Sequence, residues 1–174
     1  MHRDAARLNP YADYLGQRRV EEILPTTADE LARLTRGTPE ERLVRRPSAG
    51  RWSIRDILCH LADTELVFAV RLRYTVADAH HRIQPFDQDA WAASAATLDA
   101  ALALQTFAAV RRWNLAFIAA VMPAAHDKPV THPERGTMRF ATVVETMAGH
   151  DINHLRQVQA LVEALVEAPA AART

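Results

Sequence analysis

The sequence carries, at residues 149–154, the segment Gly149-His150-Asp151-Ile152-Asn153-His154. Residues four apart on a helix lie one above the other, so His150 and His154 would share one face. Around them, side chains recur at alternating three- and four-residue steps, the spacing of a helix that packs into a bundle core. The series consists of Val143, Met147, His150, His154, Gln157, Leu161 and Leu165. This pattern predicts a helix at about residues 139–167 with both histidines on its buried face.

Histidines in core positions need partners for their ring nitrogens. A buried polar group without a hydrogen bond costs about 1 to 3 kcal/mol, so water, backbone carbonyls or a metal ion must satisfy His150 and His154. A metal site needs a further ligand, and His60 is the best candidate because it lies at the margin of the apolar stripe of another predicted helix. Three imidazoles would leave a fourth position of a divalent ion open for water or substrate. Cys59 lies about 100° around that helix from His60 and is not expected to join them.

Composition and periodicity predict three further long helices. Glycine is scarce, with 5 residues in 174, while alanine, leucine and arginine are abundant, which favours helices over a turn-rich β protein. Pro25 is expected to divide the first helix, with Thr27 and Glu30 capping its second piece, and Pro123 is expected to end the third. The three additional helices are predicted at about 17–36, 53–77 and 94–122.

Four long helices predict an all-α fold, a four-helix bundle with long crossover connections. The connections at 78–93 and 124–136 are expected to lack regular structure, apart from one helical turn at about 87–91, because prolines and broken periodicity mark both. A chain of this length is expected to form a single domain, 1–174, with its core at about 17–167.

Charge and cysteine content limit the location and the partners. Lys plus Arg and Asp plus Glu both total 21, so no broad field attracts nucleic acid or an anionic membrane. The single Cys59 excludes an intrachain disulfide and fits a reducing compartment. No stretch has the roughly 20 apolar residues of a membrane span. Met1 is not followed by the apolar region of a signal peptide, so none is expected. We therefore expect a cytoplasmic protein with a small-molecule substrate, no nucleic-acid partner and no membrane.

Other histidines and arginines are expected to be solvated. His80, His81, His126 and His132 fall in predicted connections. The arginine pairs at 18–19, 45–46 and 111–112 are expected on exposed helix faces. None of these groups is assigned to a site from the sequence.

Several ordered motifs resemble the DinB/YfiT-like family, whose members adopt a DinB-type four-helix bundle. The matching segments are Trp52-Ser53-Ile54-Arg55-Asp56-Ile57, His60-Leu61-Ala62-Asp63, Ile83-Gln84-Pro85-Phe86-Asp87-Gln88-Asp89-Ala90-Trp91, His132-Pro133-Glu134-Arg135-Gly136, and His150 to His154 with Gln157. Each motif alone is weakly specific. The same motifs in the family's order over about residues 17–165 are fairly specific. The chain departs from many relatives at Asp151 and Asn153, which would alter the polarity of the site without changing its ligands.

The resemblance implies a divalent metal ion, zinc or nickel, bound by His60, His150 and His154. It also implies a homodimer, for which alanine-rich faces of the third and fourth helices would be available. Asp63, one turn after His60, and Gln157, three residues after His154, are the nearest polar groups for orienting a ligand or the substrate. Asp151 points about 100° away from His150 and is not expected to be a ligand.

Family members of known activity imply a transferase that joins a low-molecular-weight thiol, such as bacillithiol or mycothiol, to an electrophile. An ion held by neutral ligands would stabilise the nucleophilic thiolate. The alternative is a metal-dependent hydrolase in which the same ion carries hydroxide. The sequence is also compatible with two other hypotheses. The protein could be a non-catalytic stress protein that binds a metal or small ligand, or a bundle with core histidines and no metal.

Overall fold

In the computed structural model, which describes residues 8–167, helix α9 (Phe140–Glu167) occupies the segment that the histidine pattern predicted. The predicted all-α bundle is confirmed. The remaining helices are α2 (Ala12–Leu15), α3 (Val20–Ile23), α4 (Thr27–Thr35), α5 (Glu40–Leu43), α6 (Ile54–Ala77), α7 (Gln88–Ser94) and α8 (Ala100–Ala125), and the strands are β1 (His81–Arg82), β2 (Pro129–His132) and β3 (Gly136–Arg139).

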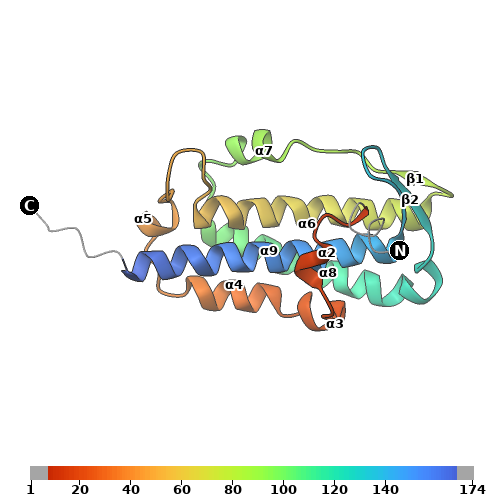
Figure 1. The fold of residues 1–174 in the computed structure, drawn as a ribbon, viewed down its shortest axis with the longest axis horizontal. Coiled ribbons are helices and arrows are strands. Elements are labelled where there is room, and N and C mark those ends of the chain that lie inside the picture. The colour runs from red at the N-terminus through yellow and green to blue at the C-terminus, as the bar shows by residue number, and fades with distance from the viewer. Residues whose placement is uncertain (1–7, 168–174) are drawn as a thin grey trace, which may run out of the picture.

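The bundle consists of α6, α8, α9 and a fourth, interrupted helix made of α3 and α4. Figure 1 shows α9 between α6 and the α3–α4 pair, with α8 behind them. Helix α8 packs against both α6 and α4, while α6 and α4 each pack against α9. The connection from α6 to α8 contains β1 and α7, and the connection from α8 to α9 contains β2 and β3. Both connections are long, as predicted.

Helix α6 begins where its sequence predicts. The Ser53 side chain accepts a hydrogen bond from the backbone N–H of Asp56, whose carboxylate accepts one from the N–H of Ser53. This capping box satisfies two N–H groups that the first turn cannot pair internally. It fixes the start of the helix and thereby the position of His60, seven residues further on.

The first predicted helix divides at Pro25, but the expected capping box is absent from α4. The residue preceding α4 is Thr26, and its side chain makes no capping hydrogen bond. The hydroxyl of Thr27 instead lies 3.0 Å from the carbonyl oxygen of Ile23 and 2.7 Å from a carboxylate oxygen of Asp151 on α9, with the shorter contact to Asp151. The polar side chain that resembled a local cap therefore joins two helices.

Helix α8 differs from its prediction at both ends. It begins after Asp99, whose carboxylate accepts a hydrogen bond of 2.7 Å from the N–H of Leu102. It continues past Pro123 to Ala125, so the prediction that this proline ends the helix is wrong. A proline in the last turn removes one hydrogen bond, and the N–H of His126 still reaches the carbonyl of Met122 at 3.0 Å. Burial of Ala125 in the core favours the extra turn.

The second predicted connection, at 124–136, contains strands rather than irregular loop alone. Strand β2 pairs parallel to β1 and antiparallel to β3. Pro129 is the first residue of β2, where the missing N–H is tolerated, and Pro133 lies in the turn between β2 and β3. Val130 and Met138 point into the core, which explains why the hairpin forms despite its prolines.

The core consists of two apolar clusters separated by a polar layer. One contains Phe68, Phe140 and Met147, and the other contains Ile57, Phe107 and Val158. Along α6 and α9, the residues that separate the two clusters include buried histidines and carboxylates. Polar groups that interrupt an apolar core cost free energy of folding. Such exceptions occur at functional sites, so this layer is the candidate site.

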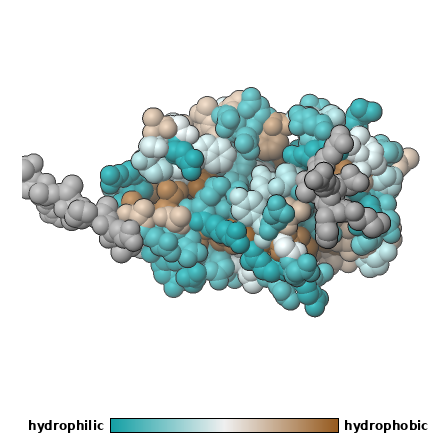
Figure 2. Space-filling view, in the orientation of Figure 1, coloured by the Kyte–Doolittle hydropathy of each residue, from teal (hydrophilic) through white to brown (hydrophobic). Residues whose placement is uncertain are grey.

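The outer surface of the bundle is mostly polar on the face shown in Figure 2, with hydrophobic residues visible in gaps between the polar side chains. Among residues 8–167, none of the helices combines the length and hydrophobicity required to cross a membrane.

Candidate metal centre

Three histidines meet in the polar layer, His60 from α6 and His150 and His154 from α9. Nε2 of His60 lies 3.0 Å from Nε2 of His150. One ring nitrogen from each histidine lies within 4.8 Å of those of the other two. Each residue is at most 5% exposed. The structure thus brings together the three residues that the sequence selected, and His60 is fully buried rather than marginal.

Aromatic rings enclose the three imidazoles. The ring of Trp52 stacks on that of His154, with an interplanar angle of 14°, and lies 4.7 Å from the centroid of His60. Tyr11 contacts His150 edge to face, with ring centroids 5.2 Å apart. These contacts limit the rotation of the imidazoles and exclude water from part of their surface.

Burial keeps the three imidazoles neutral. Loss of hydration, together with the nearby His154, lowers the pKa of His60 to about 3. Burial also lowers the pKa of His154 to about 4, against the opposing effects of Gln157 and Asp151. The pKa of His150 falls well below its ordinary value because of burial and the two other imidazoles. A neutral imidazole keeps one nitrogen lone pair, which is what a metal ligand requires.

Gln157 selects the nitrogen that His154 presents. Its side-chain oxygen Oε1 lies 3.0 Å from Nδ1 of His154. Because this oxygen can only accept, Nδ1 carries the proton and Nε2 keeps the lone pair. The amide orientation agrees with a second contact, in which Nε2 of Gln157 donates to Oδ1 of Asn153. Orientation of an imidazole through its other nitrogen is the usual support for a metal ligand.

The expected contact of Asp63 is not found. Among the described residues it makes no hydrogen bond with the three histidines, and it is Thr64 whose hydroxyl lies 3.4 Å from Nε2 of His60. Burial raises the pKa of the Cys59 thiol and the nearby charge of Asp63 adds to this rise, so Asp63 lies on the Cys59 side of α6. One residue along a helix is a rotation of about 100°, so the carboxylate of Asp63 and the hydroxyl of Thr64 point in different directions.

The three histidines fit a divalent ion. They supply three neutral nitrogen donors, already gathered within 4.8 Å and desolvated. Imidazole is a suitable ligand for zinc, nickel and other first-row metals, and three protein ligands leave a coordination position open. Nε2 of His60 and Nε2 of His150 lie 3.0 Å apart, close enough to share a proton in a hydrogen bond when no metal is bound, or to bind one cation together.

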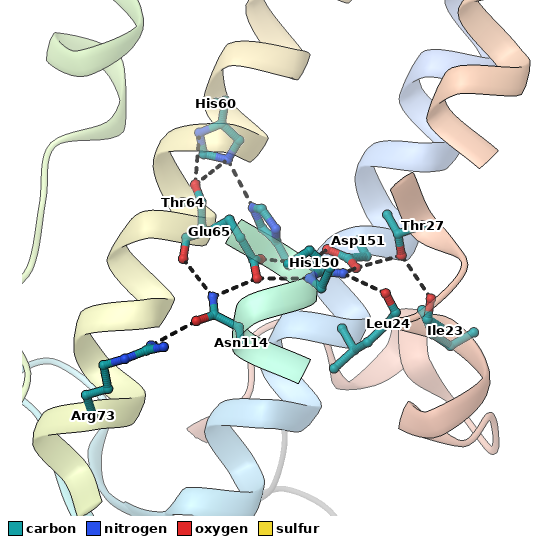
Figure 3. Close-up of polar contacts among 11 residues, drawn as sticks. Ile23, Leu24, Thr27, His60, Thr64, Glu65, Arg73, Asn114, His150 and Asp151 are labelled. Atoms are coloured by element: carbon teal, nitrogen blue, oxygen red, sulfur yellow. Dashed lines mark hydrogen bonds and ion pairs between the residues drawn. The ribbon is translucent and has the colours of Figure 1, made fainter. Parts of the chain in front are cut away.

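A buried ionic cluster adjoins the site (Figure 3). The guanidinium of Arg111 donates to Glu65 at 2.9 and 2.7 Å and to Asp151 at 2.5 and 3.0 Å. Asn114 donates to Glu65 at 2.8 Å, and Thr27 donates to Asp151 at 2.7 Å. The cluster connects α4, α6, α8 and α9, and Asp151 directly follows His150. It therefore fixes the relative positions of the two helices that carry the histidines.

Arg111 contradicts the expectation of a solvated arginine pair. It is 2% exposed, whereas the neighbouring Arg112 is exposed. Burial works against the charge of Arg111, but Asp151 and Glu65 raise the pKa of its guanidinium above its ordinary value. The local sequence gives no sign of this, because the two carboxylates lie 46 and 40 residues away along the chain. Arg18 and Arg19 are exposed, as expected.

Two cavities reach the histidines from different sides. One, of about 620 Å³, is lined by Trp52, His154 and Gln157. The other, of about 340 Å³, is lined by His60 and His150. Tyr11 lies at the border of both. Small molecules can thus approach the three imidazoles from the loop before α6 and from the sheet end.

His132 was expected to be solvated, but it is 4% exposed and lines the smaller cavity. Its Nδ1 accepts a hydrogen bond from the backbone N–H of Glu134 at 3.2 Å. The prediction was wrong because it treated the segment as loop, whereas the final residue of β2 points inward. His80 and His126 are exposed, as expected, and His81 is half-buried.

Two residues at the site were not identified as functional from the sequence. Tyr11 precedes the predicted core, which began at about residue 17. Trp52 belongs to a segment whose only recognised feature was its resemblance to the family. The isolated Gly149 within a strong helical pattern was the available signal for Tyr11, since such a glycine usually permits close packing.

A four-helix bundle with a buried cluster of three histidines defines the class of this protein. Residues 23–158 match the sequence profile of the DinB superfamily, and the chain belongs to this superfamily. The resemblance recognised from the ordered motifs is thereby confirmed.

Proteins from several bacilli are similar to this chain. A protein of Bacillus mycoides is 25% identical over 140 residues, which cover 79% of this chain and 80% of that protein. One from Oceanobacillus iheyensis is 24% identical over 138 residues, covering 76% and 80%. Both are named "putative metal-dependent hydrolase".

A solved structure shares the fold. YfiT from Bacillus subtilis superposes with a TM-score of 0.79 at 16% identity, over 88% of this chain and 91% of YfiT. YfiT is described as a probable metal-dependent hydrolase with an unusual four-helix bundle topology. At this identity the similarity establishes the fold of the present chain alone.

Proposed function

We propose that this chain is a metal-dependent enzyme whose active site is the cluster of His60, His150 and His154. The observation that carries the proposal is the convergence of three buried, neutral imidazoles at a point reached by two cavities. The names of the relatives support the same class of activity. Zinc or nickel suits this donor set.

The surrounding residues have separate roles in this proposal. Gln157 holds the tautomer of His154, and Trp52 and Tyr11 restrict the rings and the access of water. The cluster of Arg111, Glu65 and Asp151 keeps α6 and α9 in register. A bound divalent ion supplies a Lewis acid that lowers the pKa of a coordinated water or thiol.

Metal content tests the site directly. Protein purified without nickel affinity is expected to contain about one divalent ion per chain, and His150→Ala is expected to contain none. His126→Ala, which changes an exposed histidine, is the matched control and should retain the metal. Wild-type protein that neither contains nor takes up a divalent ion would contradict the proposal. The chain would then be a bundle whose core histidines bind no metal.

Hydrolysis is the first candidate reaction, and the names of the relatives support it. Turnover of ester or amide substrates by metal-loaded protein, without an added thiol, is the expected result. Loss of this turnover in His150→Ala but not in His126→Ala would assign it to the site.

Thiol transfer to an electrophilic small molecule is the second candidate. Among the described residues, the side chains that hydrogen-bond or stack with the three imidazoles include no carboxylate. A reaction whose nucleophile is a thiolate needs no protein base once the thiol is deprotonated. Conjugation of model electrophiles to bacillithiol, mycothiol or glutathione is expected, and strict dependence on the thiol would exclude hydrolysis.

A non-catalytic metal-binding protein makes a different spectroscopic prediction. In the cobalt-substituted protein, an open coordination position would change the visible spectrum when thiols or anions are added. An unchanged spectrum would indicate a closed site and contradict the proposed enzyme.

We also propose that the chain forms a homodimer. Large apolar side chains are exposed on α6 and α8, among them Val70, Tyr74 and Trp113 at 53%, 52% and 67%. Leu66, Val70 and Tyr74 are all exposed and follow at four-residue steps on α6, so they lie along one face. Contiguous exposed apolar surface is typical of association sites. Sedimentation at micromolar concentration should give a dimer for the wild type and a monomer for Trp113→Glu, and a monomeric wild type would contradict the proposal.

A further inference from the structure

The smaller cavity beside the histidines carries two arginines. Arg71 on α6 and Arg135 in the turn between β2 and β3 both line it, together with His60 and His150. Both arginines are half-buried, and neither forms a salt bridge with a described residue. Two half-buried guanidinium groups therefore face the same space, next to the proposed reaction centre.

Arg71 has unused hydrogen-bonding capacity. A guanidinium carries five N–H donors, yet the only hydrogen bond of this group within residues 8–167 is a long one of 3.4 Å from Nη2 to the carbonyl of Gln84. Its Nε is buried without a partner. The guanidinium carbon lies 5.8 Å from the ring centres of both Phe68 and Phe86, so cation–π contacts hold the side chain while its donors remain available.

The surroundings do not neutralise this charge. Burial and the nearby Arg135 lower the pKa of Arg71 to about 10, which still leaves it protonated at neutral pH. The carboxylate on the cavity wall is that of Glu134, which is exposed. His132 adds a donor, because its Nδ1 accepts from the N–H of Glu134 and its Nε2 then carries the proton. The cavity thus offers several donors and an excess of positive charge.

We propose that this cavity is an anion subsite, in which Arg71, Arg135 and His132 bind a carboxylate or phosphate group of the substrate. That the anion is part of a substrate rests on the proposed function. That the cavity binds an anion does not. Guanidinium groups bind both kinds of oxyanion through paired, charge-assisted hydrogen bonds. A substrate anchored in this cavity would place its adjoining atoms against His60 and His150, which line the same space.

Titration of the metal-free, full-length protein with inorganic phosphate and, separately, with acetate tests the subsite. The measurement is the shift of assigned NMR resonances at constant ionic strength. At least one anion should cause saturable shifts at Arg71, Arg135 and His132. Saturation by phosphate alone would identify phosphorylated substrates, and saturation by acetate would identify carboxylates.

Variants separate binding from the packing role of the arginine. Arg71→Met keeps an unbranched side chain against Phe68 and Phe86 but removes the charge, and it should weaken anion binding at least tenfold. Arg135→Met, a change in a turn, should do the same without affecting the fold. Arg112→Met, at an exposed position on α8, should leave the affinity unchanged.

The outcomes distinguish this inference from the proposed enzyme. The subsite is overturned if neither anion binds saturably to the wild type, or if Arg71→Met and Arg135→Met both bind the anion as tightly as the wild type does. Metal uptake is measured on the same proteins and should be equal in the wild type and both variants. If the protein binds the anion but takes up no metal, the anion subsite is supported and the proposed metal-dependent reaction is contradicted.

Discussion

Gly149 and Tyr11 are in direct contact, although 138 residues separate them in the sequence. A Cβ atom at position 149 would lie 2.4 Å from the carbonyl oxygen of Tyr11 and 2.7 Å from its Cβ. Only glycine allows the N-terminal segment to approach α9 this closely. The contact places the ring of Tyr11 against His150, the next residue of the helix. A glycine that weakens the helix by about 1 kcal/mol thereby closes one side of the histidine cluster.

Gly149→Ala is expected to displace the segment containing Tyr11. The overlap with a backbone carbonyl costs about 1 to 3 kcal/mol and the gain in helix propensity is about 1 kcal/mol, so the free energy of unfolding should fall by up to about 2 kcal/mol. Hydrogen exchange should show reduced protection at residues 9–15, while α8 remains protected. Unchanged exchange in that segment would contradict the close contact.

Arg111→Met should be among the most destabilising single changes in the chain. It leaves the carboxylates of Glu65 and Asp151, each 1% exposed, without their shared cation. Removal of one partner from a buried ionic cluster costs about 3 to 5 kcal/mol. The adjacent Arg112→Met changes an exposed residue and should alter stability by about 0.5 kcal/mol or less. Urea unfolding of both variants gives the comparison, and similar midpoints would show that the cluster contributes little.

The sequence predicted what depends on local pattern. The apolar periods of α9 and α6 are visible within a few helical turns, so both helices were predicted. The meeting of His60 with His150 and His154 was expected from the places of these residues on the two apolar stripes and from the family resemblance, and the structure brings the three together. Residues whose role depends on distant partners were not. Arg111 resembled a surface arginine because its two carboxylates come from other helices.

In the connections between helices, too, the orientation of a side chain depends on partners that are distant in the sequence. His132 was placed in a loop because prolines surround it, and only its pairing within the sheet turns it inward. Asp63 and Thr64 could not be distinguished as neighbours of His60, because one residue along a helix changes the direction by about 100°. The rotation of α6 against α9, which decides between them, is set by packing over the whole bundle.

Acidification should destabilise the metal-free protein well above the pH at which carboxylates titrate. Unfolded histidine has a pKa of about 6.5, whereas the folded values of His60 and His154 are about 3 and about 4. Between these limits the unfolded state binds more protons, so stability rises with pH and is lost as pH falls. Each histidine contributes a slope of up to about 1.4 kcal/mol per pH unit.

Urea unfolding between about pH 7.5 and 5 measures this slope. His154→Ala should reduce it, because one buried histidine no longer takes up a proton on unfolding. His126→Ala, which changes an exposed residue, is the control. A free energy of unfolding that stays constant over this range in the wild type would show that the three imidazoles are not desolvated as described.

Gln157→Leu should weaken metal binding without unfolding the protein. The side-chain oxygen of Gln157 fixes the proton of His154 on Nδ1, and leucine of similar size removes that acceptor while keeping the contact with the cavity wall. Loss of such a supporting hydrogen bond typically reduces metal affinity by about 10- to 100-fold. Gln157→Glu, which retains an acceptor, should lose much less.

Gln159→Leu provides the matched control, since Gln159 lies two residues further along α9 and contacts Glu163 at an exposed position. Competitive titration with a zinc chelator measures all three variants and the wild type. If Gln157→Leu and Gln159→Leu bind zinc equally well, Gln157 does not set the tautomer of His154.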